Sequence, residues 1–69
     1  MMTVDARGLS CPEPVVLTRD ALHASPEGCE VLVDSPAPRE NVLRFAASQG
    51  CQVSSEELED GSWRLVLSR

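Results

Sequence analysis

The residue best suited to chemistry in this chain is Cys11, which stands directly before a Pro-Glu-Pro triplet in the segment LSCPEPVVL. Proline is tolerated in the first turn of a helix because the first amides there have no intrahelical partner, so Pro12 and Pro14 predict a helix start. A thiol at that position meets the positive end of the helix dipole, which favours the thiolate. Since this effect is worth about 0.3–1 kcal/mol, we expect a pKa lowered by less than about one unit, with Glu13 opposing it.

A second Pro-x-Pro segment, Ser35-Pro36-Ala37-Pro38, provides an internal comparison. Serine is a preferred N-cap residue, and it stands where cysteine stands in the first segment. Cys11 as a mere helix cap is the structural alternative. The use of cysteine, a poor cap, at one helix start and serine at the other favours a chemical role for Cys11.

Several kinds of cysteine chemistry are excluded by spacing. His23 is the only histidine and stands 12 positions after Cys11 on the predicted helix. At about 1.5 Å per residue the two lie ~18 Å apart, too far for a Cys-His pair to share a proton. The three cysteines and this histidine match no zinc pattern, so we expect neither a metal nor a cofactor. Thiolate exchange remains, because it needs an exposed thiolate and a leaving sulfur but no base.

The elements that must position Cys11 are predicted from periodicity and turn residues. The expected order is βαβαββ, with strands at 3–6, 29–33, 51–58 and 63–67 and helices at 12–24 and from 36 or 38 to 49. Asp60-Gly61 predicts the hairpin turn before the last strand. Right-handed crossovers would place both helices on one face of the sheet. The fold class is therefore α+β: a two-layer α/β sandwich with a four-stranded mixed sheet, formed by one domain over residues 1–69.

The predicted core is aliphatic, because Trp63 and Phe45 are the only aromatic residues. The inward positions are predicted to be Val15, Leu17, Thr18, Ala21, Leu22, Val42, Phe45, Ala46, Trp63, Leu65 and Leu67. Cys29 and Cys51 are expected to be small core residues at strand starts. Both would then lie at the sheet edge opposite Cys11, ~16 Å away, so we expect no resolving cysteine within the chain.

Composition restricts the function classes. The net charge is −5 and the chain contains no lysine, which argues against a nucleic-acid partner. No apolar run is long enough to span a membrane, and the first residues lack the features of a signal peptide. An odd number of cysteines without paired spacing predicts free thiols and a cytoplasmic location.

The segment Val4–Val15, VDARGLSCPEPV, is similar to the signature of the TusA/SirA-like family of sulfur carrier proteins, with its Cys-Pro-x-Pro motif. This resemblance implies that Cys11 carries a persulfide. The sulfur would come from a protein donor such as a cysteine desulfurase or a rhodanese and pass to an acceptor protein. It also implies a fold like the C-terminal domain of bacterial translation initiation factor 3, with only the last strand antiparallel.

Two departures refine the resemblance. Members that act in tRNA thiolation carry an arginine before the motif cysteine, and this chain has Ser10 there. The segment 33–50 is more similar to the N-terminal domain of YedF-type proteins associated with selenium metabolism, which usually continue into a second domain. Together with the acidic charge, these features argue against a role on tRNA. They leave two expectations open: a stand-alone carrier, or one half of a larger protein or assembly.

The predicted site comprises Cys11 as the sulfur-bearing residue, supported by Pro12, Glu13, Pro14, Arg7 and Asp5. Arg7 either stabilises the thiolate or persulfide or pairs with a nearby carboxylate, and Asp5 is expected to form a turn more than to act in catalysis. Our interpretation is a sulfurtransferase-type persulfide carrier. The alternative is a non-catalytic protein-binding or regulatory module that uses the same rim.

Overall fold

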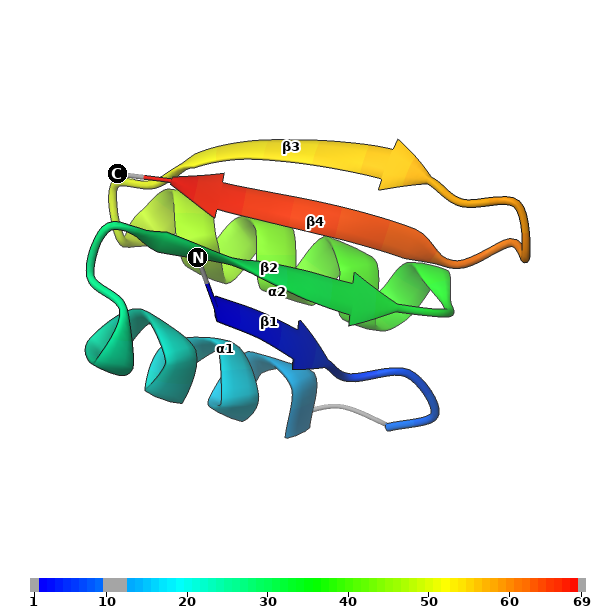
Figure 1. Cartoon of the computed structure of the whole chain (residues 1–69), viewed down its shortest axis with the longest axis horizontal. Helices are drawn as coiled ribbons and strands as arrows, with labels where there is room; N and C mark the ends of the chain where they lie inside the picture. Colours follow the sequence, from blue (N-terminus) through cyan, green and yellow to red (C-terminus); the bar gives the residue numbers. More distant parts are fainter. Residues whose placement is uncertain (1, 10–12, 69) are drawn as a thin grey trace.

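The computed structural model describes residues 2–9 and 13–68 of the chain. Within these residues four strands and two helices follow the predicted order βαβαββ (Figure 1). The elements are β1 (Met2–Asp5), α1 (Glu13–Ala24), β2 (Gly28–Val33), α2 (Pro36–Ser48), β3 (Gln52–Glu57) and β4 (Trp63–Ser68). The predicted α+β fold class is confirmed.

The described strands form one mixed sheet in the order β1-β2-β4-β3. β1 pairs in parallel with β2, whereas β4 lies between β2 and β3 and is antiparallel to both. The expectation that only the last strand is antiparallel is therefore confirmed. The first strand begins and ends one residue earlier than predicted, although the amide of Ala6 still donates to the carbonyl of Leu32 at 2.9 Å and continues the ladder.

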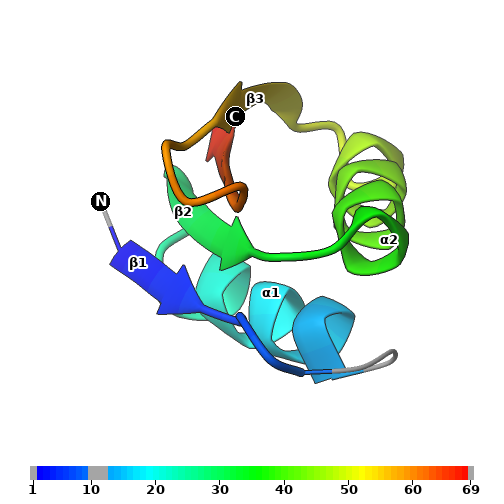
Figure 2. The same ribbon diagram turned by 90° about the vertical axis from the view of Figure 1, so that its right-hand side faces the viewer.

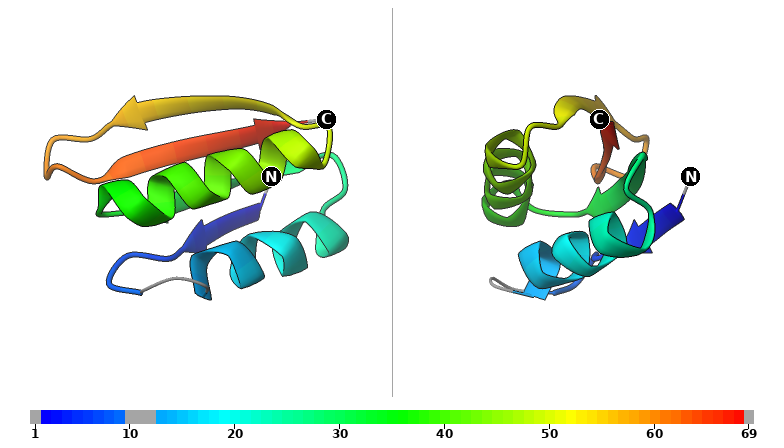
Figure 3. Two further views of the ribbon diagram at one scale, coloured as in Figure 1. Left: turned by 180° about the vertical axis from the view of Figure 1, so that it is seen from behind. Right: turned by 90° about the vertical axis from the view of Figure 1, so that its left-hand side faces the viewer.

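Both helices cover the same face of the sheet and leave the other face open (Figures 2 and 3). Helix α1 packs on β1 and β2, and α2 packs on β3 and β4. This arrangement buries alternate residues of the two central strands, since successive side chains of a strand point to opposite faces. Cys29, Val31 and Val33 of β2 and Leu65 and Leu67 of β4 are the buried row.

The helices complete this small core with a narrower set of residues than the periodicity predicts. Thr18, Ala21, Leu22, Val42 and Ala46 are buried as expected. The predicted core residues Val15, Leu17, Phe45 and Trp63 are only partly buried and pack against the edge of the core. Strand β3 is exposed at all six positions, because it is an edge strand that α2 covers incompletely.

Gly28 is the glycine on which the sheet most depends. Its φ is +137°, and a Cβ atom there would lie 2.2 Å from the backbone oxygen of Leu67. No side chain fits between β2 and β4 at this point, because the nearest atom belongs to backbone that cannot rotate away. This close approach fixes the register at the beginning of β2.

Candidate functional site

Three connections meet at one end of the sheet, the right-hand end in Figure 1. They are the segment that follows β1, the junction between β2 and α2, and the β3–β4 hairpin. Parallel strands end at the same edge of a sheet, and the hairpin turns at that edge because β3 runs in the same direction as β1 and β2. The chain that leads to the predicted sulfur-bearing cysteine therefore leaves the sheet where residues from three parts of the sequence converge.

Of the predicted site residues, Cys11 and Pro12 lie outside the described residues. Asp5 and Arg7 are brought into direct contact with each other. Glu13 is the first residue of α1 and is exposed, whereas Pro14 is fully buried. Pro14 is thus a core residue as well as a helix-starting residue, which the sequence analysis did not foresee.

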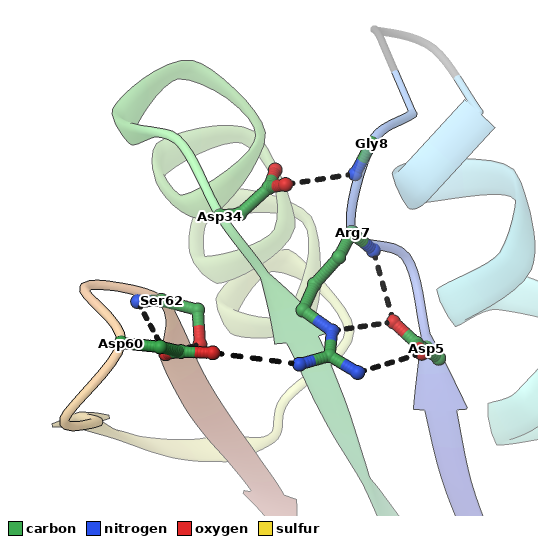
Figure 4. Close-up of polar contacts among 6 residues, drawn as sticks. All are labelled: Asp5, Arg7, Gly8, Asp34, Asp60 and Ser62. Carbon is green, nitrogen blue, oxygen red and sulfur yellow. Dashed lines mark hydrogen bonds and ion pairs between the residues drawn. The ribbon is translucent and has the colours of Figure 1, made fainter.

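The segment from Ala6 to Leu9 has a hydrogen-bond acceptor for each of its four consecutive amides. The amide of Ala6 bonds to β2 as described above, and the amide of Leu9 donates to the carbonyl of Ala6 at 3.4 Å. Two carboxylates accept the other two: Asp5 Oδ1 from Arg7 at 3.2 Å and Asp34 Oδ2 from Gly8 at 3.0 Å (Figure 4). These amides are occupied by groups of the protein itself, so residues 6–9 have no free amide to bind an anion.

Gly8 occupies the third position of the turn that the Leu9–Ala6 hydrogen bond closes. Its φ is +79°, the left-handed region that a type II turn requires at this position. A Cβ atom there would meet nothing within 4 Å, so the need for glycine is conformational and not steric.

The Arg7 guanidinium is held between two carboxylates, as Figure 4 shows. Its Nε and Nη2 atoms donate to the two oxygens of Asp5 at 2.9 and 3.0 Å, and its Nη1 atom lies 3.7 Å from Asp60 Oδ2. Hydrogen bonds from Arg7 lower the pKa of Asp5, and the carboxylate in turn raises the pKa of Arg7. The structure thus shows Arg7 paired with carboxylates, one of the two roles weighed from the sequence. Asp5 is the last residue of β1, and its side chain accepts from the Arg7 amide just before the turn.

Three residues of this region were not predicted from the sequence: Asp34, Asp60 and Ser62. Asp60 accepts hydrogen bonds from the amide of Ser62 at 3.0 Å and from its hydroxyl at 2.5 Å, which lower the pKa of the Asp60 carboxyl. Asp34 follows the end of β2 directly. Its place at the carboxyl end of a strand parallel to β1 was the signal that could have placed it beside the loop.

The internal comparison with Ser35 needs a correction. Ser35 is the N-cap of α2 with extended backbone (φ −149°, ψ 158°), but its side chain makes no capping hydrogen bond with any described residue. Proline has no N–H, so Pro36 and Pro38 remove two of the first three donors of the helix, including the third-position amide that a serine cap often uses. The presence of serine before one Pro-x-Pro segment and cysteine before the other therefore supports a chemical role for Cys11 less strongly than predicted.

The other two cysteines lie at the opposite end of the strands. Cys29 pairs with Met2 at the beginning of β1, and Cys51 stands just before β3. Both are buried, and burial raises the pKa of the Cys29 thiol, with a smaller contribution from Cys51. The expectation that these two are core residues is confirmed.

His23 is exposed near the end of α1, and the loop to the predicted cysteine lies before the beginning of that helix. Among residues 2–9 and 13–68 no three His, Cys, Asp or Glu side chains are grouped to hold a metal ion. Neither described helix is long and apolar enough to cross a membrane.

Comparison with known proteins identifies the family. Residues 2–69 match the family model of sulfurtransferase TusA, so the chain belongs to the TusA family. Proteins of Archaeoglobus fulgidus (40% identical over 97% of this chain and 91% of the relative) and Methanocaldococcus jannaschii (35% identical over 100% and 95%) both carry the name "Putative sulfur carrier protein".

The crystal structure of a SirA-like protein from Desulfitobacterium hafniense is similar across the whole fold. Its TM-score is 0.90 at 32% sequence identity, over 99% of this chain and 96% of that one. The predicted membership of the TusA/SirA-like family is confirmed. The family and its relatives support a sulfur carrier role that involves protein partners.

Proposed function

We propose that this protein relays sulfur as a persulfide on Cys11, from a donor protein to an acceptor protein. The thiolate of Cys11 attacks the terminal sulfur of a donor persulfide. One S–S bond forms, the S–S bond of the donor breaks, and the donor leaves as a thiolate. An acceptor nucleophile then attacks the terminal sulfur on Cys11 and releases the Cys11 thiolate, so the relay causes no net oxidation.

The observation that carries this proposal is the family match over residues 2–69, which includes the complete Cys-Pro-Glu-Pro motif. The burial of Cys29 and Cys51 at the far end of the sheet supports Cys11 as the reactive thiol. The distance expected between Cys11 and these two cysteines also favours transfer of the sulfur to a nucleophile of a partner protein. An internal disulfide would need Cα atoms within about 7 Å of each other. A cysteine desulfurase or a rhodanese-like protein is the proposed class of donor, in a reducing cytoplasm.

Mass spectrometry tests the relay. After incubation with a cysteine desulfurase and cysteine, the peptide that contains Cys11 should gain about 32 Da, and an acceptor thiol should remove that mass. Peptides that contain Cys29 or Cys51 serve as internal controls and should stay unmodified. A protein that binds a donor but never gains sulfur would instead be the non-catalytic binding module considered from the sequence.

A further inference from the structure

We propose that Asp34 is a positioning residue for sulfur transfer, because its hydrogen bond with the Gly8 amide holds the loop that leads to Cys11. The bond joins residues 26 positions apart at a donor–acceptor distance of 3.0 Å. It ties the junction between β2 and α2 to the segment that follows β1 (Figure 4). This role rests on the proposed function and identifies a residue outside the Cys-Pro-x-Pro motif that acts on it.

Gly8 is the point of the loop that most needs an external contact. Glycine populates left-handed and right-handed backbone conformations about equally, so Gly8 restricts the chain less than its neighbours do. Its φ of +79° is selected in this structure by two hydrogen bonds, one that closes the turn from Leu9 to Ala6 and one from Gly8 to Asp34. Only the second fixes the turn relative to another element.

Each of the other hydrogen bonds and ion pairs that join the loop to the rest of the fold lies before Gly8. Ala6 is bonded to β2, and Arg7 is paired with Asp5 and Asp60. Among the described residues, the bond from Gly8 to Asp34 is therefore the last hydrogen bond to another part of the fold before the loop continues toward Cys11. Beyond it, the Leu9 side chain packs against the core without a directional contact.

Position matters for this reaction because the thiolate must approach the donor S–S bond along its axis. Misplacement of a reacting group by about 1 Å can lower a rate by about 100-fold. The carboxylate contributes a hydrogen-bond acceptor, and it also adds a negative charge near a site that handles anionic sulfur. If Asp34 acts through geometry, a neutral hydrogen-bond acceptor at this position will keep the rate of sulfur loading near that of the wild type. If Asp34 acts through its charge, a neutral acceptor will not keep that rate.

The test compares Asp34→Ala, which removes the acceptor, with Asp34→Asn, whose side-chain carbonyl can still accept from the Gly8 amide. Asp20→Ala is the matched control, since Asp20 is an exposed aspartate on α1 that contacts the neighbouring Arg19. The measurements are the single-turnover rate of sulfur loading at saturating desulfurase, its dependence on donor concentration, and hydrogen exchange of the Gly8 amide. Urea unfolding establishes that each variant is folded under the assay conditions.

We expect Asp34→Ala to load sulfur about tenfold more slowly at saturating donor, with half-saturation unchanged and Gly8 exchange faster. The loading rate of Asp34→Asn should remain within about threefold of the wild-type rate, and Asp20→Ala should load sulfur at the wild-type rate. Loading by Asp34→Ala at the wild-type rate, or an equal loss in Asp34→Asn and Asp34→Ala, would overturn the positioning role. Failure of the wild-type protein to load sulfur would instead overturn the proposed function, together with this role.

Discussion

The two strand-to-helix junctions of this protein use the same helix start but differ in what precedes it. Between β2 and α2 stand only Asp34 and Ser35, whereas residues 6–12 separate β1 from α1. Each helix has a Pro-x-Pro sequence at its beginning, and the second proline is buried in both. The helix start is thus a shared structural device, and the longer loop is what distinguishes the first junction.

The two junctions also differ in the contacts that hold their chains in place. The short junction needs no side-chain bond from its serine cap, and it supplies the Asp34 carboxylate that anchors Gly8 in the long one. The long junction also uses Asp60 of the β3–β4 hairpin through Arg7. The described part of the long junction is therefore held by acidic residues from two other connections.

The largest expected effect comes from moving the thiol between the junctions. Cys11→Ser should reduce sulfur loading to background and leave the fold intact, as judged by circular dichroism. Adding Ser35→Cys to that variant should not restore loading, because the second junction lacks the longer segment that precedes the first helix. Mass spectrometry of desulfurase-treated protein measures both. If the double variant loads sulfur, a helix start alone is sufficient for the chemistry; an unfolded Cys11→Ser variant would mean that the thiol is structural.

Replacement of the two buried prolines should have smaller and unequal effects on the free energy of unfolding. Pro14→Ala should lower the free energy of unfolding by about 1–2 kcal/mol, through lost apolar burial and a less restricted unfolded chain. Pro38→Ala should cost less, because it restores an amide that Ser35 can cap. Urea denaturation measures both, with the exposed Pro26→Ala as control. Equal losses for Pro14→Ala and Pro38→Ala would argue against the capping explanation.

Acid should weaken the first junction selectively. The folded-state pKa values of Asp5 and Asp60 are lowered by their hydrogen bonds, so their contribution is present above the unfolded pKa and is lost as pH falls below about 4. The double variant Asp5→Asn/Asp60→Asn should be less stable than the wild type at pH 7, and the difference should shrink on acidification. Thermal unfolding from pH 7 to 3 measures this, with Asp20→Asn as control. If the stability difference between the double variant and the wild type stays constant with pH, the lost stability comes from packing and not from the charged carboxylates.

The smallest effect is expected at Ser35. Because its hydroxyl makes no capping bond with the described residues, Ser35→Ala should change the free energy of unfolding by less than about 0.5 kcal/mol. A serine that caps its helix would lose about 1 kcal/mol. Urea denaturation distinguishes these two changes in the free energy of unfolding. A loss of about 1 kcal/mol would show that Ser35 caps its helix, and the contrast with Cys11 would then again support a chemical role for the cysteine.

Much of the fold could be predicted because the relevant signals are local. Alternating Trp63, Leu65 and Leu67 indicated a strand, and Asp60-Gly61 indicated the hairpin before it. The predicted boundaries of β1 and β3 differ by one residue at each end, where the pairing of the strands decides where the ladder stops. The extent of burial of Val15, Phe45 and Trp63 was overestimated, because periodicity gives the direction of a side chain but not how fully a neighbour covers it.

Three features follow from the amino-acid sequence alone: the order of elements, the two proline-marked helix starts and the motif that connects Cys11 with the TusA family. These depend on residues close together in the chain, where backbone preference and spacing act directly. The proximity of Asp34 to Gly8 and of Asp60 to Arg7, in contrast, arises from the folding of the whole chain. Their convergence requires the strand order β1-β2-β4-β3 and the parallel pairing of β1 with β2, which bring the ends of separate strands to one edge of the sheet.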